Sequence, residues 1–63
     1  MTKNEVNAKV AEAIEFLERA QPGRPMYERV ANREKANAIM AELTMRDLRK
    51  ISDEMFALLG RYV

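Results

Sequence analysis

The sequence has no cysteine, no histidine and no tryptophan, and its 63 residues include only two glycines and two prolines. Without cysteine and histidine, disulfides and the usual zinc sites are excluded. Nucleophilic catalysis by serine or threonine also needs an activating base, most often histidine. We therefore expect no catalytic residues, no metal site and no cofactor, and we expect a protein that acts by binding another macromolecule.

Long apolar runs are also missing. No stretch approaches the roughly 18 apolar residues that a membrane span needs, and residues 1–6 lack the apolar segment of a signal peptide. Eleven basic and ten acidic residues nearly cancel, so no strong net charge attracts nucleic acid or anionic lipid. We expect a cytoplasmic protein that does not act at a membrane.

The first third of the chain has the pattern of an amphipathic helix. Thr2-Lys3-Asn4-Glu5 has the form of a capping box, in which the hydroxyl and the carboxylate each bond the other residue's backbone. Apolar residues then follow at spacings of three and four, which places them on one helix face. The sequence predicts a helix over about 2–20 with a buried face formed by Val6, Val10, Ala13, Ile14, Leu17 and Ala20.

Residues 21–25, Gln-Pro-Gly-Arg-Pro, end this helix because proline lacks a backbone donor. The sequence then predicts helical structure over about 26–59, continuous or broken once, near Thr44 or Ser52, where N-cap patterns occur. Gly60 is expected to follow the last helical residue in a left-handed conformation. The expected apolar seam has a four-three spacing and consists of Ala38, Ala41, Met45, Leu48, Met55, Leu59 and Tyr62.

These elements predict one all-α domain over residues 1–63, a helical hairpin whose two arms are antiparallel. A chain of this length buries only about 60% of the surface that its unfolded form exposes. Since disulfides and zinc are excluded, packing against a second chain is the expected reinforcement. Most oligomers are symmetric, so we expect a homodimer that forms a bundle of helices.

The C-terminal half is rich in methionine and other large apolar residues. Flexible thioethers adapt to exchangeable partners, although ordinary core filling is an alternative reason for the same residues. We expect an interface, with a second copy or an unidentified protein partner, flanked by Arg46 and Arg49. Its centre is predicted at Met45, Leu48, Met55, Phe56 and Leu59.

The middle of the chain is basic, because residues 22–51 carry seven basic and four acidic side chains. Helical spacing groups these cations on common faces, where they would meet phosphates. The interspersed acidic residues favour a solvated helix face instead. The alternative function is therefore nucleic-acid binding through Arg29, Arg33, Arg46, Arg49 and Lys50.

Residues 41–45, Ala-Glu-Leu-Thr-Met, are followed by Leu48, Lys50 and Ile51 in an arrangement that resembles part of the Hha/YmoA family. The resemblance implies a small helical protein that modifies gene silencing by binding the nucleoid protein H-NS. In length and general character, the chain is also similar to accessory proteins from early operons of lambdoid phages. Together these resemblances imply a non-enzymatic regulatory or adaptor protein, encoded by a phage or plasmid, that modulates host or phage gene expression or development.

Overall fold

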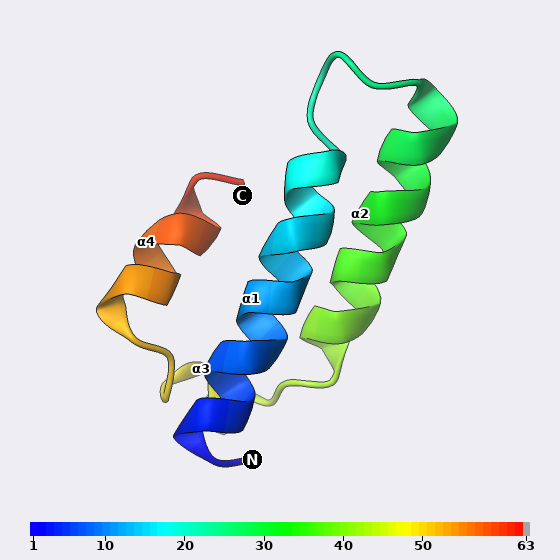
Figure 1. Cartoon of the computed structure of the whole chain (residues 1–63). Helices are drawn as coiled ribbons and strands as arrows, with labels where there is room; N and C mark the ends of the chain where they lie inside the picture. Colours follow the sequence, from blue (N-terminus) through cyan, green and yellow to red (C-terminus); the bar gives the residue numbers. More distant parts are fainter. Residues whose placement is uncertain (63) are drawn as a thin grey trace.

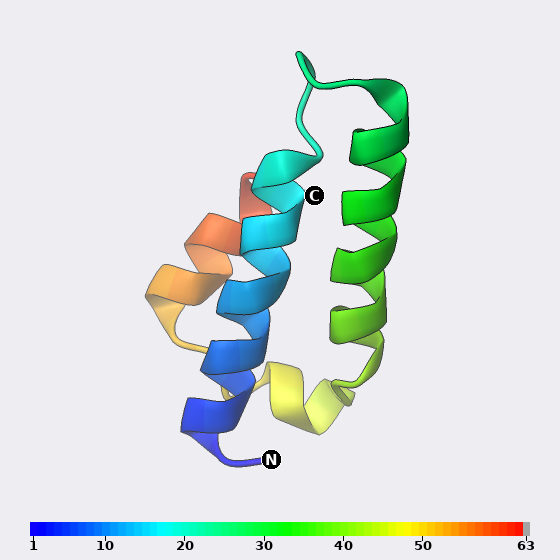
Figure 2. The ribbon, with the colours of Figure 1, turned by 45° about the vertical axis from the view of Figure 1, so that its right-hand side comes forward.

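The computed structural model describes residues 1–62 and contains four helices, with no strand among those residues. The helices are α1 (Lys3–Arg19), α2 (Met26–Ala41), α3 (Met45–Leu48) and α4 (Asp53–Gly60). Figures 1 and 2 show α2 running antiparallel to α1 on one side, while α4 returns along the other side of α1. The predicted all-α class is confirmed, and α1 is the central helix.

The capping box at the start of α1 is formed as predicted. The backbone N–H of Glu5 donates to Thr2 Oγ1 at 3.2 Å, and the backbone N–H of Thr2 donates to Glu5 Oε1 at 3.1 Å. The helix ends at Arg19, where the side-chain amide of Gln21 donates to the carbonyl of Leu17 at 3.1 Å. All six residues of the predicted apolar face are buried: Val6, Val10, Ala13, Ile14, Leu17 and Ala20.

The turn between α1 and α2 uses both glycine and proline. Gly23 has a φ of 105°, which side-chain-bearing residues rarely adopt. Pro25 is the N-cap of α2, where its missing donor leaves no helical hydrogen bond unmade. Below the turn, α2 packs on α1 through the buried side chains of Ala36, Ala13 and Leu17. The small alanine side chains let the two helices approach closely.

The predicted apolar seam of α2 has the wrong register. Ala38 and Ala41 are exposed, whereas Ala36 is buried and both Ile39 and Met40 pack against the core. The prediction extended one spacing from 38 to 62 as though the helix were continuous. The chain turns after α2, so the residues beyond Ala41 do not continue its helix. The face of α2 that is buried is therefore determined by its packing against α1 in the hairpin.

The segment 26–59 is broken twice, so the prediction of one helix, or of one break, is wrong. The backbone N–H of Asp47 donates to Thr44 Oγ1 at 3.1 Å, and the N–H of Thr44 donates to Asp47 Oδ2 at 3.1 Å. The N–H of Met55 donates to Ser52 Oγ at 3.2 Å. Both capping patterns therefore begin new helices, because each satisfies backbone donors that a preceding turn would otherwise bond.

The second break lets α4 fold back onto α1. Met55, Leu58 and Leu59 pack against the buried cluster of Val6, Val10 and Ile14 in α1, and this burial covers the second side of the central helix. The predicted two-helix hairpin is thus one part of a four-helix arrangement.

Gly60 is the last residue of α4 and does not adopt a positive φ, so its predicted left-handed conformation is wrong. The helix ends instead with ordinary backbone turns. The N–H of Arg61 donates to the carbonyl of Leu58 at 3.2 Å, and the N–H of Tyr62 donates to that of Leu59 at 3.1 Å. The end of α4 therefore does not require glycine.

Polar contacts attach α3 and the following turn to the start of α1. The amino group of Met1 lies 3.4 Å from Asp47 Oδ1, and Lys50 Nζ donates to the carbonyl of Met1 at 2.6 Å. The backbone N–H of Ser52 donates to Asn7 Oδ1 at 3.0 Å. These contacts join residues far apart in the sequence and fix the position of α3.

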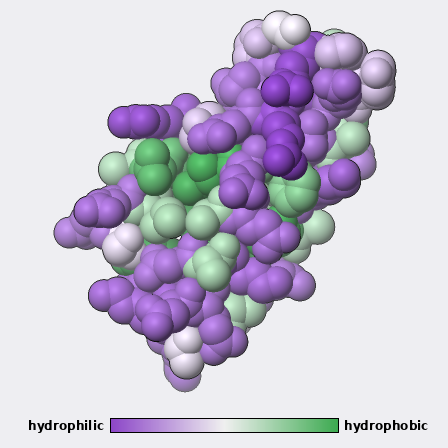
Figure 3. Space-filling model, viewed as in Figure 1, coloured by the Kyte–Doolittle hydropathy of each residue, from purple (hydrophilic) through white to green (hydrophobic). Residues whose placement is uncertain are grey.

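The surface is mainly hydrophilic on the face shown in Figure 3. A band of hydrophobic atoms crosses the middle of this face, where α4 packs beside α1. Within residues 1–62, every helix is too short or too polar to cross a membrane.

Candidate functional site

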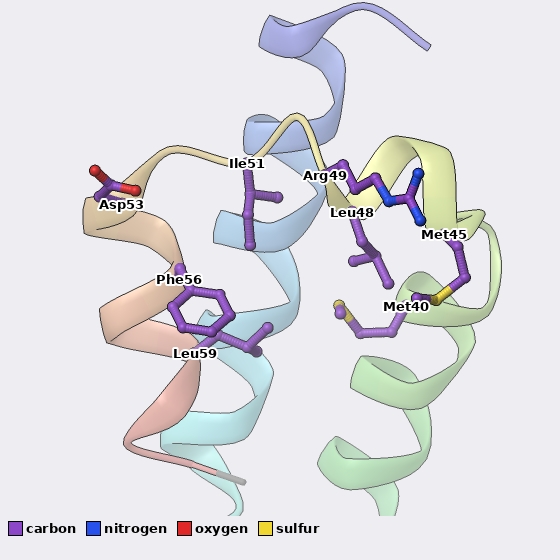
Figure 4. Close-up of a pocket in the computed structure, with 8 residues that line it drawn as sticks. All are labelled: Met40, Met45, Leu48, Arg49, Ile51, Asp53, Phe56 and Leu59. Carbon is purple, nitrogen blue, oxygen red and sulfur yellow. The ribbon is translucent and has the colours of Figure 1, made fainter.

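An apolar groove of about 520 Å³ lies between the end of α2, α3 and α4 (Figure 4). Met40 and Met45 lie on one wall, and Phe56 and Leu59 lie on the other, with Leu48 between them. Six apolar side chains line the groove: Met40, Met45, Leu48, Ile51, Phe56 and Leu59.

The two helix breaks create this groove. The cap at Thr44 starts α3 across the end of the hairpin, and the cap at Ser52 starts α4 in the direction back along α1. Met40, Ile51 and Leu59 also pack against the buried core. The groove is therefore an opening directly above the core.

The groove exposes large apolar side chains to solvent. Met45 is 71% exposed and Phe56 is 69% exposed, although both belong to residue types that favour burial. Burying apolar surface stabilises a protein by roughly 25 cal/mol per Å². Any surface that covered both side chains would gain from this effect.

The structure brings four of the five predicted interface residues together and separates the fifth. Met55 packs against the core cluster of α1 and does not line the groove. Met40 and Ile51 line the groove but were not predicted, because a seam drawn along a continuous helix bypasses them. The caps at Thr44 and Ser52 were the sequence signal that would have located them. The predicted residues in the groove are Met45, Leu48, Phe56 and Leu59.

Two opposite charges border the groove. Arg49 and Asp53 are exposed, and Figure 4 shows them at the same end of the groove, on opposite walls. Within residues 1–62, neither side chain forms a salt bridge. Arg46, also predicted to flank the interface, is exposed on α3 but does not line the groove.

The predicted nucleic-acid contacts do not form one surface. Arg29 and Arg33 lie in the first half of α2, whereas Arg46, Arg49 and Lys50 lie on α3 or directly after it. Figure 1 shows α3 beyond the C-terminal end of α2, away from the half of α2 that contains Arg29 and Arg33. The ammonium of Lys50 is also bonded to the backbone at the N-terminus. The structure therefore divides the basic residues into two separate groups.

The position of α3 depends on an ionised carboxylate. The backbone N–H of Thr44 donates to Asp47, and this hydrogen bond holds the pKa of the Asp47 carboxyl below its ordinary value. The Thr44 hydroxyl and the ammonium of Met1 lower the pKa further, whereas the burial of the carboxyl opposes the shift. Asp47 is therefore ionised at neutral pH, and its contacts stabilise the wall of the groove that α3 forms.

Among residues 1–62, no three acidic side chains are placed to hold a metal ion. No protein-family model, curated protein or solved structure matches this chain.

Proposed function

We propose that this protein is a non-enzymatic regulatory or adaptor protein that acts by binding another protein chain in the groove. The observation that carries the proposal is the open apolar groove whose walls include the exposed Met45 and Phe56. The surface of another chain would cover them, and this burial would drive association.

The composition of the groove also supports a protein partner. Methionine, aromatic residues and arginine are enriched at protein interfaces, and the groove contains all three kinds in Met45, Phe56 and Arg49. Flexible methionine side chains adjust to surfaces of different shape. By its resemblances to the Hha/YmoA family and to lambdoid-phage accessory proteins, the proposed process is the modulation of host or phage gene expression.

The proposal is tested by capture with a tagged chain that is co-expressed with an untagged copy. Phe56→Asp places a charge in the groove, and Tyr27→Asp is its matched control. Tyr27 is 74% exposed on α2 and lies outside the groove, so both changes replace an exposed aromatic ring by a carboxylate. We expect the wild type and Tyr27→Asp to capture the same chains, and we expect Phe56→Asp to lose them.

Circular dichroism verifies that both variants are helical before capture is compared. If the folded Phe56→Asp variant captures the same chains as the wild type, the groove is not the binding surface and the proposed function is refuted.

A further inference from the structure

We infer that the groove binds a second copy of this chain across a twofold axis that runs along the groove. In this arrangement Arg49 of each copy pairs with Asp53 of the other, and Phe56 of each copy enters the groove of the other. The inference rests on the proposed function, because it assumes that the groove binds protein. It adds the identity of the occupant and its orientation.

The positions of the two charges carry the inference. Arg49 and Asp53 lie at the same end of the groove but on opposite walls (Figure 4). A twofold rotation about an axis parallel to the groove places the α4 wall of each copy opposite the other wall of its partner. The same rotation keeps corresponding ends of the two grooves together. Each Arg49 then faces an Asp53 of the other copy, and two ion pairs form. A twofold interface requires such a self-complementary surface.

The same operation brings apolar side chains together. The α4 wall of one copy faces the wall of the other copy that contains Met40 and Met45. Phe56, which lines the groove on α4 and is largely exposed, meets these thioethers, and sulfur contacts aromatic rings favourably. The exposed surfaces of Met45 and Phe56 are covered in both copies at once.

Other occupants fit the groove less well. An acidic segment would pair with Arg49 but would be repelled by Asp53, and a basic segment would have the opposite difficulty. An uncharged apolar ligand would leave both charges without partners. A second copy satisfies both charges, and it also supplies the additional burial that a chain of 63 residues needs.

The test uses complementary charge reversals in the full chain, measured by sedimentation equilibrium at low salt. Arg49→Glu leaves two acidic groups at the end of the groove, and Asp53→Lys leaves two basic groups. We expect a dimeric wild type and a dissociation constant at least ten times higher for each variant alone, because like charges then face each other. An equimolar mixture should restore dimers that contain one chain of each variant.

The control variants are Arg46→Glu and Glu54→Lys. They make the same charge changes on α3 and α4 at exposed positions that do not line the groove, so we expect both to dimerise as the wild type does. Circular dichroism verifies that all four variants keep their helices.

Two results would overturn the inference. One is a mixture of Arg49→Glu and Asp53→Lys that is no more dimeric than either variant alone. The other is a wild type that stays monomeric at millimolar concentration. If Phe56→Asp still loses captured chains in either case, the groove binds another protein and the proposed function stands. If Phe56→Asp captures what the wild type captures, the proposed function fails as well.

Discussion

Replacing Val10 by alanine tests the central position of α1 in the fold. Val10 is 0% exposed and lies in the buried cluster with Val6 and Ile14. The change removes two methyl groups, each worth about 0.8 kcal/mol of transfer free energy. The space left behind adds a further cost, and alanine's higher helix propensity returns about 0.5 kcal/mol. We expect Val10→Ala to lower the free energy of unfolding by roughly 2 to 3 kcal/mol.

That loss is large for so short a chain. At 0.05 to 0.15 kcal/mol per residue, the whole domain has a stability of roughly 3 to 9 kcal/mol. Each kcal/mol shifts the melting temperature by about 4 to 8 °C in a domain of this size, so we expect a fall of roughly 8 to 24 °C. Thermal unfolding followed by circular dichroism measures it. The protein concentration is held constant, because the dimer inferred above would make the melting temperature depend on concentration.

Val30→Ala is the matched control. Val30 is 48% exposed on α2, so the same substitution gives the same gain in helix propensity with little loss of burial. We expect its stability to stay within about 0.5 kcal/mol of the wild type. If Val10→Ala and Val30→Ala melt at the same temperature, Val10 does not contribute more buried packing than Val30, and the central position of α1 is refuted.

Two further predictions concern a carboxylate and the glycines. The hydrogen bond from Thr44 lowers the pKa of Asp47 in the folded state. The Asp47 carboxylate therefore stabilises the protein fully above the unfolded pKa of about 3.9. This stabilisation is lost as the pH falls through the lower pKa of the folded state. Urea unfolding across pH 2 to 6 should therefore show a weaker pH dependence in Asp47→Asn, and parallel profiles would contradict this. Gly23→Ala should destabilise by about 1 to 2 kcal/mol, because the φ of Gly23 is positive. Gly60→Ala should stabilise by about 0.4 to 1 kcal/mol, because Gly60 is helical and has open space around its Cα. If Gly23→Ala and Gly60→Ala melt at the same temperature, the difference in backbone conformation between the two glycines is refuted.

The sequence predicts α1 well because two independent local signals agree. The capping box at Thr2 places its start, and the spacing of the apolar residues identifies its buried face. Both signals depend only on neighbours along the chain. The rest of the chain has no such agreement, because its apolar spacing is compatible with several arrangements.

The second break was not predicted because its free energy depends on tertiary packing. Each cap is worth about 1 kcal/mol, which is similar to the gain from continuing a helix through a few residues. The balance is decided when α4 folds back and buries Met55, Leu58 and Leu59 against α1. Capping patterns and apolar spacing along the chain contain no information about that contact.

Only some of the groove residues were predicted, again because the groove depends on tertiary packing. An excess of large apolar residues after Met45 predicts that some of them are exposed, whatever the path of the chain. Which side chains reach the groove depends on both turns. This dependence explains why Met40 and Ile51 were missed and why Met55 lies on the core side of α4.

The buried alanines where α1 and α2 pack limit how the sequence can diverge. Ala13 and Ala36 belong to the same buried cluster, so a larger residue at either position would force the helices apart. Exposed positions on both helices are free to drift, whereas these two can exchange only with the smallest residues unless a neighbour shrinks. A small residue at each of these positions, together with the cap at Thr2, would distinguish a true descendant of this fold from an unrelated helical chain of the same length.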